Sequence, residues 1–243
     1  MIEVRDLHFA YRGVAREVLA GISLTVARGR RVLVIGANGA GKTTLLRVLA
    51  GKHMVDPSRV RVLGTSAFHD PALSSRIELL GGRFAFEVDL QVKEILARRP
   101  DVDPVRRDRL LDVLGVDVEW HMHAVSDGQR RRVQLVLGLM QPREILLLDE
   151  ITTDLDLIAR QDLLAFLREE SERHGTTLLY ATHIFDTLER WATDVLYLAG
   201  GKIGLHLPID QVLGQVLGQV TGQASEPLVS IVERWLRRDS PTP

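Results

Sequence analysis

The hydrophobic positions of the chain form short apolar runs that alternate with segments of helical spacing. Three such runs open the chain, at residues 2–4, 22–26 and 31–35. The third is apolar enough for a strand that is buried on both faces. A glycine-rich turn at 36–41 follows it, and residues 43–49 then have helical spacing that stops at Gly51. This order of strand, loop and helix predicts the start of an α/β domain.

Helical spacing dominates the middle of the chain, over residues 83–140, where one helix is expected to follow Ser126. Apolar runs return at 145–148 and 177–180, separated by a helix that covers 163–167. Uniformly apolar runs of this length are typical of parallel strands covered on both faces. The pattern therefore predicts an α/β core with a mainly helical insertion.

The pattern changes after Pro208, where a four-residue repeat at 211–222 precedes an amphipathic helix over 228–238. The apolar stripe of this helix consists of Leu228, Ile231, Val232, Trp235 and Leu236. Such a stripe must be covered, because burying each large apolar side chain contributes about 1.5 to 3 kcal/mol. We expect residues 1–207 to be the catalytic domain and residues 208–243 to be a C-terminal helical appendage that docks onto a partner. Packing on the chain's own core is the alternative.

Composition and charge narrow the classes of protein that fit this pattern. With 243 residues and 45% hydrophobic content, the chain can bury a substantial core. Its 31 basic and 32 acidic residues nearly cancel, so no nucleic-acid partner is predicted. The chain shows neither a signal-peptide pattern nor a transmembrane run of roughly 18 apolar residues, so we expect a cytoplasmic protein. Because cysteine is absent, any metal must bind oxygen or histidine ligands.

Residues 36–43, with the sequence GANGAGKT, match the P-loop pattern between a buried strand and a helix. The glycines let backbone N–H groups close around phosphate oxygens, and the helix N-terminus faces that negative charge. Lys42 is expected to reach the β- and γ-phosphates of ATP, and Thr43 to bind Mg²⁺. A chance glycine-rich turn is the alternative, which the flanking strand and helix argue against. The predicted ATP contacts are Asn38, Gly39, Gly41, Lys42, Thr43 and Thr44.

Two adjacent carboxylates, Asp149 and Glu150, follow the apolar run at 145–148. Open α/β sheets bind their ligands at the carboxyl ends of buried strands, and this is the Walker B position relative to a P-loop. We expect Asp149 to hold Mg²⁺ and Glu150 to act as the general base toward the attacking water. An acidic helix cap is the alternative for this pair.

In this order, the motifs resemble those of the nucleotide-binding module of the ABC ATPase superfamily, over residues 1 to about 205. Residues 125–130, VSDGQR, resemble the family's signature sequence, and residues 153–156 resemble its D-loop. The resemblance implies a P-loop ABC fold: a RecA-like core, an N-terminal antiparallel β subdomain and a helical signature subdomain. It also implies that Tyr11 stacks on adenine and that His183 is the switch histidine, a catalytic group at the γ-phosphate.

The resemblance also implies how two such modules work together. Ser126, Gly128 and Gln129 belong to the signature, which in this family binds the ATP held by the opposite subunit's P-loop. Two ATP molecules would therefore join two subunits head to tail, as a homodimer in the ATP-bound state. A regulatory protein partner is compatible with this arrangement.

Two positions depart from the family's pattern. Asp127 replaces a signature glycine, and a carboxylate about 6 Å from a phosphate charge would cost roughly 3 kcal/mol. We therefore expect Asp127 to turn away toward an arginine of the 130–132 run, which is otherwise taken as a solvated helix face. Gly82 stands where the family's Q-loop has glutamine, and neither Gln91 nor Glu87 is a clear replacement.

These departures point to a subgroup of the family. The soluble ABC ATPases of fungi and plants that have no membrane domain are resembled by the Ser-Asp-Gly signature together with residues 130–134, 149–156, 182–186 and 232–237. One fungal member is linked to the CCR/NOT transcription-regulatory complex. The resemblance implies a soluble ATPase that acts as a nucleotide-driven switch or regulator. The alternatives are the energy-coupling subunit of an ABC transporter, which would need a separate membrane protein, and a scaffold that binds ATP without turnover.

Overall fold

The computed structural model describes residues 1–14, 16–82, 89–185, 188–217 and 227–239, with only the backbone described for 215–217. Glu87 and the later part of the four-residue repeat, including Gly218 and Gly222, lie outside these ranges. Within them, every helix is too short or too polar to cross a lipid bilayer.

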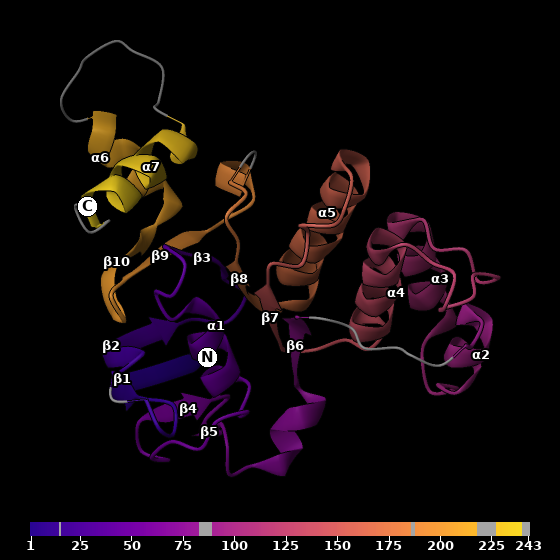
Figure 1. Cartoon of the computed structure of the whole chain (residues 1–243), viewed down its shortest axis with the longest axis horizontal. Helices are drawn as coiled ribbons and strands as arrows, with labels where there is room; N and C mark the ends of the chain where they lie inside the picture. Colours follow the sequence, from indigo (N-terminus) through magenta and orange to yellow (C-terminus); the bar gives the residue numbers. More distant parts are fainter. Residues whose placement is uncertain (15, 83–88, 186–187, 218–226, 240–243) are drawn as a thin grey trace.

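A six-stranded, mainly parallel sheet forms the centre of the molecule (Figure 1). Its strands, in spatial order, are β10 (Lys202–Pro208), β9 (Asp194–Ala199), β3 (Arg31–Gly36), β8 (Thr177–Ala181), β7 (Ile145–Asp149) and β6 (Ile77–Gly81). Only β10, at one edge, pairs antiparallel with its neighbour. The strands expected at 31–35, 145–148 and 177–180 are confirmed, each one residue longer than its apolar run.

A second, four-stranded antiparallel sheet is built mostly from the N-terminal segment. Its strands are β2 (Leu19–Val26), β1 (Ile2–Phe9), β4 (Val60–Val62) and β5 (Thr65–Ser66), in that spatial order. This sheet is the predicted N-terminal antiparallel β subdomain. The α/β fold expected from the sequence is confirmed.

The helices lie at both ends and on both faces of the six-stranded sheet. They are α1 (Lys42–Leu49), α2 (Val92–Ala97), α3 (Pro104–Leu114), α4 (Asp127–Leu139), α5 (Leu157–His174), α6 (Ile209–Leu217) and α7 (Leu228–Asp239), with short 3₁₀ turns at Pro71–Ser75 and Leu188–Arg190. Figure 1 shows α2, α3 and α4 grouped beyond β6, and α6 and α7 at the β10 end. The helical insertion predicted in the middle of the chain is therefore present.

The core is divided by the six-stranded sheet into two clusters. Alternate residues of β3 point to opposite faces, so that Leu33 and Ile35 join the cluster beneath α3, α4 and α5. Val32 and Val34 join the other cluster, with α1 and the antiparallel sheet. All four side chains are fully buried, which explains why this strand has no alternation of polar and apolar residues.

The apolar stripe of α7 is covered by the chain itself. Leu228, Ile231 and Val232 are buried in the cluster that also contains residues of α4 and α5. The ring of Trp235 lies 5.1 Å from that of Tyr197, whose hydroxyl donates a 2.6 Å hydrogen bond to Asp239. The expectation that this stripe docks onto a partner is therefore corrected, because the alternative of packing on the chain's own core accounts for it. The boundary at residue 208 stays a prediction.

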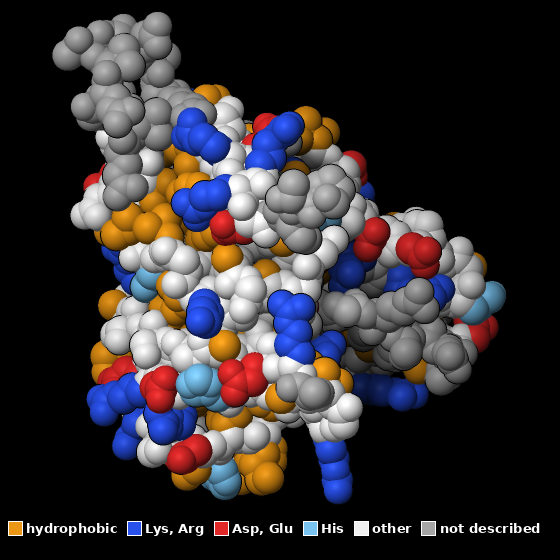
Figure 2. Space-filling view, turned by 60° about the vertical axis from the view of Figure 1, so that its left-hand side comes forward, with side chains coloured by type: hydrophobic (Ala, Val, Ile, Leu, Met, Phe, Trp, Pro, Cys, Tyr) orange, Lys and Arg blue, Asp and Glu red, His pale blue; other side chains and the backbone are white. Residues whose placement is uncertain are grey.

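Charged side chains of both signs are interspersed on the face shown in Figure 2. Basic and acidic groups lie next to one another in the lower left part of this view. On the N-terminal sheet and its loops, Arg59 pairs with Asp6 and Arg5 with Glu3. Such mixing produces no extended field of one sign on this face.

Candidate nucleotide-binding site

The P-loop connects the end of β3 to the start of α1, as its sequence pattern requires. The Nζ atom of Lys42 donates hydrogen bonds to the carbonyl oxygens of Gly36, at 2.7 Å, and Ala37, at 3.1 Å. Burial lowers the pKa of Lys42, and the nearby carboxylates of Glu150 and Asp149 partly oppose that shift. The ammonium group is thus held across the loop by carbonyls, where phosphate oxygens would be stronger acceptors.

Gly41, the N-cap of α1, has a positive φ of 103°. A Cβ atom at this position would lie 2.8 Å from Leu19 Cδ2 and 2.9 Å from the Val18 carbonyl oxygen. Both the conformation and the close packing exclude a larger residue. This glycine lets the loop lie against the start of β2.

A cavity of about 240 Å³ lies over the P-loop. It is lined by Val18, Asn38, Gly39, Ala40, Gly41, Lys42, Thr43, Thr44, Asp149 and Glu150. The structure therefore brings every predicted P-loop contact together with both carboxylates of the Walker B position. Lys42 and Asp149 are 107 residues apart in sequence. Because β3, β8 and β7 are parallel neighbours, the loop after β3 and the carboxylates after β7 lie at the same carboxyl ends of the strands, where open α/β sheets bind their ligands.

Asp149 ends β7 and contacts the P-loop helix. Burial raises the pKa of Asp149 above its ordinary value, and a hydrogen bond with the Thr43 side chain opposes this shift. Strand β6 approaches closely here: a Cβ atom on Gly81 would lie 2.6 Å from the Asp149 Cβ, so this position requires glycine. A hydroxyl and a carboxylate oxygen side by side form a donor set that suits Mg²⁺, as predicted for Thr43 and Asp149.

Glu150 has an unusual backbone conformation and an unsatisfied carboxylate oxygen. Its φ of 53° lies in the left-handed region, which costs a non-glycine residue of the order of 1–3 kcal/mol, and its N–H donates a 2.9 Å bond to Ala181. Its Oε2 atom is 2.8 Å from His183 Nδ1 but is too poorly aligned for a hydrogen bond, and has no hydrogen-bond partner among the described residues. A carboxylate that lines the P-loop cavity and faces an imidazole fits the role of general base toward water that was predicted for Glu150.

Comparison with known proteins assigns this site to a family. Residues 19–153, more than half of the chain, match the family model described as ABC transporter. The chain belongs to the ABC ATPase family. It is accordingly an ATP hydrolase of that type, and the resemblance drawn from the motifs is confirmed.

Two relatives of this ABC ATPase come from a plant and a yeast. ABC transporter I family member 20 of Arabidopsis thaliana is 46% identical, over 98% of this chain and 76% of the relative. CCR4-associated factor 16 of Saccharomyces cerevisiae is 39% identical, over 83% of this chain and 76% of the relative. The expected similarity to plant and fungal members is thus confirmed, and the fungal one is named as a CCR4-associated factor.

Solved structures show the same fold at low sequence identity. The ATP-binding subunit of an ABC transporter superimposes with a TM-score of 0.80 at 23% identity, over 98% of this chain and 99% of that structure. A dimeric ATP-binding cassette bound to ADP and Pi gives a TM-score of 0.73 at 19% identity, over 86% of this chain and 99% of that structure. At these identities the likeness establishes the fold.

The signature segment of this ABC ATPase forms the N-terminus of α4. Ser126 is the N-cap: its hydroxyl accepts from the Gln129 N–H, and the Gln129 side chain accepts from the Ser126 N–H. A Cβ atom on Gly128 would lie 2.9 Å from the carbonyl oxygen of Asp154, in the D-loop. Ser126, Gly128 and Gln129 do not line the P-loop cavity. Their roles at the nucleotide therefore stay predictions that concern another subunit's site.

Arg130, Arg131 and Arg132 each contact residues other than Asp127. Arg131 lies 3.5 Å from the Asp154 carboxylate, and Arg132 pairs with Asp156, the N-cap of α5. Arg130 donates to a backbone carbonyl, and Asp127 is exposed with no ion pair among the residues that the structure describes. The expected pairing of Asp127 with this run, and the view of the run as a solvated face, are therefore wrong. The cause is the D-loop, which brings two carboxylates alongside α4.

Among the residues that the structure describes, no glutamine takes the place of the family's Q-loop glutamine. Gly82 follows β6, and its carbonyl accepts a 2.9 Å hydrogen bond from Arg131. Gln91 caps α2 in a capping box with Glu94, so its side chain is committed locally. Arg131 thus connects the end of β6 to the signature helix and the D-loop, a role that the sequence analysis missed.

Tyr11 lies next to the P-loop helix without lining the cavity. Its hydroxyl is 3.1 Å from the Thr44 hydroxyl, and its ring packs edge-on against Phe9 and His53. The predicted stacking of Tyr11 on adenine is untested and stays a prediction.

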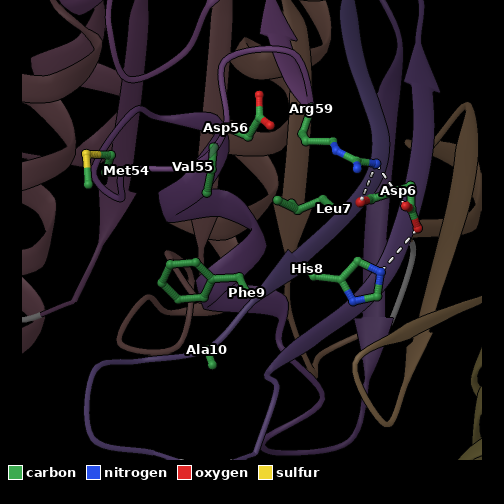
Figure 3. Close-up of a pocket in the computed structure, with 9 residues that line it drawn as sticks. All are labelled: Asp6, Leu7, His8, Phe9, Ala10, Met54, Val55, Asp56 and Arg59. Carbon is green, nitrogen blue, oxygen red and sulfur yellow. Dashed lines mark hydrogen bonds and ion pairs between the residues drawn. The ribbon is translucent and has the colours of Figure 1, made fainter.

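A second cavity, of about 330 Å³, lies on the N-terminal sheet and shares no lining residue with the P-loop cavity. Figure 3 shows Asp6 between His8 and Arg59, at 3.2 Å and 2.8 Å. Asp56, which also lines this cavity, accepts hydrogen bonds from Ser58. The acidic groups of this cavity are therefore bound by neighbouring side chains of the N-terminal sheet and its loops.

Proposed function

We propose that this chain binds Mg²⁺-ATP and hydrolyses it at the interface of a head-to-tail homodimer, acting as a nucleotide-driven switch or regulator. The observation that carries the proposal is that one chain contains both halves of an ABC site, with only one half at its own cavity. The P-loop and Walker B residues line that cavity, whereas Ser126 and Gly128 do not, and Gly128 lies against Asp154 of the D-loop. A second copy can supply the missing signature.

The size of the cavity also supports a site completed by a partner. At about 240 Å³ it is smaller than the roughly 300–1,000 Å³ of sites that enclose most of their ligand. ATP held by this P-loop would therefore be partly exposed on the single chain. A signature helix N-terminus from a second copy would cover it and add positive dipole ends near the terminal phosphate.

Five residues at the site have distinct parts in the proposed reaction. Lys42 exchanges its two carbonyl acceptors for phosphate oxygens, and Thr43 with Asp149 would hold Mg²⁺. The bound Mg²⁺ would neutralise charge that develops on the phosphates. The Glu150 carboxylate would accept a proton from the attacking water, and His183, whose Nδ1 is 2.8 Å from Oε2, would orient that carboxylate or the γ-phosphate.

The process coupled to hydrolysis has two candidates. The yeast relative is named as a factor associated with CCR4, and this name supports a regulatory protein partner for this chain. The nickel import ATP-binding protein NikO of Rhodobacter capsulatus, 34% identical over 87% of this chain, supports the energy-coupling subunit of a transporter instead. The Gly82 substitution favours the switch, since the family's Q-loop glutamine links nucleotide to membrane subunit. Recovery of the chain in a stable complex with a membrane protein would reverse this preference.

ATP-dependent association tests the dimer. We expect the Glu150→Gln variant, which holds ATP without turnover, to double its mass by light scattering when Mg²⁺-ATP is added. Adding Ser126→Arg to that variant should keep it monomeric, because a bulky cation replaces the N-cap that faces the partner's nucleotide. ADP serves as the control that should leave both variants monomeric. A monomer at saturating Mg²⁺-ATP would refute the homodimer.

A further inference from the structure

Asp89, His121 and His123 form a cluster of metal-ligating side chains outside the nucleotide site. One carboxylate oxygen, Asp89 Oδ1, is 3.2 Å from His121 Nδ1 and 2.5 Å from His123 Nδ1. One ligand atom from each residue lies within 4.8 Å of the others, and all three side chains are exposed. The two imidazole rings are 5.7 Å apart and nearly perpendicular.

The backbone explains why these side chains converge. An antiparallel bridge pairs Gln91 with His121, and Met122 N–H donates to the Leu90 carbonyl at 3.0 Å. This pairing places His121 beside the segment that carries Asp89. Residues 122–124 then form a turn, in which the Ala124 N–H donates a 2.9 Å hydrogen bond to the His121 carbonyl, and His123 within this turn also reaches Asp89. The cluster is therefore set by the pairing of two segments and not only by the chosen side-chain rotamers.

We propose that Asp89, His121 and His123 bind a divalent transition-metal ion of the Zn²⁺ class. Two imidazole nitrogens and one carboxylate oxygen are a ligand set that Zn²⁺ accepts, with the remaining positions left to water. Mg²⁺ prefers oxygen ligands, so the nucleotide's cation and this one are distinguished by donor type.

A metal at this position would join two parts of the helical subdomain. Asp89 precedes α2, and His123 is three residues before Ser126, the N-cap of the signature helix. Between them, the two segments are connected by backbone hydrogen bonds at Leu90, Val92 and Lys93. The bound ion would therefore add a side-chain crosslink next to the element that reaches the partner's nucleotide, and stabilise the folded chain by mass action.

Calorimetric titration of the metal-free full chain with ZnCl₂, without nucleotide, tests the proposal. We expect one saturable site and a rise in melting temperature of about 5–10 °C at roughly 100 times the dissociation constant. His121→Ala and His123→Ala should each weaken binding by more than the roughly 10–100-fold that the loss of an outer-shell partner causes. Millimolar Mg²⁺ should not displace the ion.

His8→Ala is the matched control, because His8 also contacts two carboxylates but through opposite ring nitrogens. This variant should bind Zn²⁺ as the unaltered chain does. Circular dichroism of each variant checks that it is folded. Absence of saturable binding, or undiminished affinity in the folded double variant His121→Ala/His123→Ala, would overturn the proposal.

Discussion

Replacing Glu150 by glutamine is expected to leave ATP binding intact and to slow hydrolysis by about 10² to 10⁴-fold. Glutamine keeps the shape of the side chain and its neutral amide cannot accept the proton of the attacking water. Glu150 lines the P-loop cavity beside Lys42 and Thr43, and its Oε2 atom lies 2.8 Å from His183 Nδ1, which is the placement proposed for the general base. Single-turnover phosphate release, with binding of a fluorescent ATP analogue measured in parallel, separates the two effects.

The Lys42→Ala variant is expected to lose ATP binding instead, and it serves as the comparison for Glu150→Gln. Losing charge-assisted hydrogen bonds to phosphate is expected to weaken ATP binding by about 10- to 100-fold. Thus Glu150→Gln should bind without turnover, whereas Lys42→Ala should fail at binding. Undiminished steady-state turnover in Glu150→Gln would remove Glu150 from the role of general base.

Removing the chain after Pro208 is expected to lower the melting temperature by about 10 °C or more. Three side chains of α7, Leu228, Ile231 and Val232, are buried in the main core, and each contributes about 1.5 to 3 kcal/mol. For a chain of this length, 1 kcal/mol corresponds to about 2–4 °C. Scanning calorimetry of the full and shortened chains measures the difference.

Point variants in α7 keep this prediction testable if the shortened chain does not fold. Ile231→Ala should cost about 2–5 kcal/mol through lost burial and the resulting cavity. Val229→Ala, on the same helix but 40% exposed, should have little effect. Similar melting temperatures for the full chain, the shortened chain and Ile231→Ala would show that the tail is an appendage after all.

The sequence was most informative where one local pattern determines the structure. The P-loop match required a strand before residue 36 and a helix after residue 41, and β3 and α1 occupy those places. The stripe of α7 predicted a buried helical face, because periodicity reports that a face is covered. It did not predict what covers it, since the covering residues, such as Tyr197, belong to a distant strand.

Interactions between distant segments were the ones that sequence reasoning missed. The partners of Arg131 and Arg132 are D-loop carboxylates whose position depends on how β7 and α4 pack, so the nearest acid in sequence, Asp127, was the wrong choice. The Asp89 cluster was missed for the same reason. Asp89 is 32 residues from His121 and 34 from His123, and the two segments are brought together by the antiparallel bridge between Gln91 and His121. A pair of histidines at alternate positions, 121 and 123, was the signal available in the sequence.

Mixing two inactive variants tests the head-to-tail site most directly. Lys42→Ala destroys the P-loop half of a site and Ser126→Arg destroys the signature half, so each variant alone should lack ATPase activity. In a head-to-tail dimer formed from one chain of each kind, one site combines the two damaged halves and the other combines two intact halves. Neither variant is expected to form an ATP-joined dimer by itself, so an equal mixture should recover activity through mixed dimers only, up to about half of the normal activity, because each mixed dimer has one intact site of two. A mixture no more active than its components would contradict a site shared between two copies of this chain.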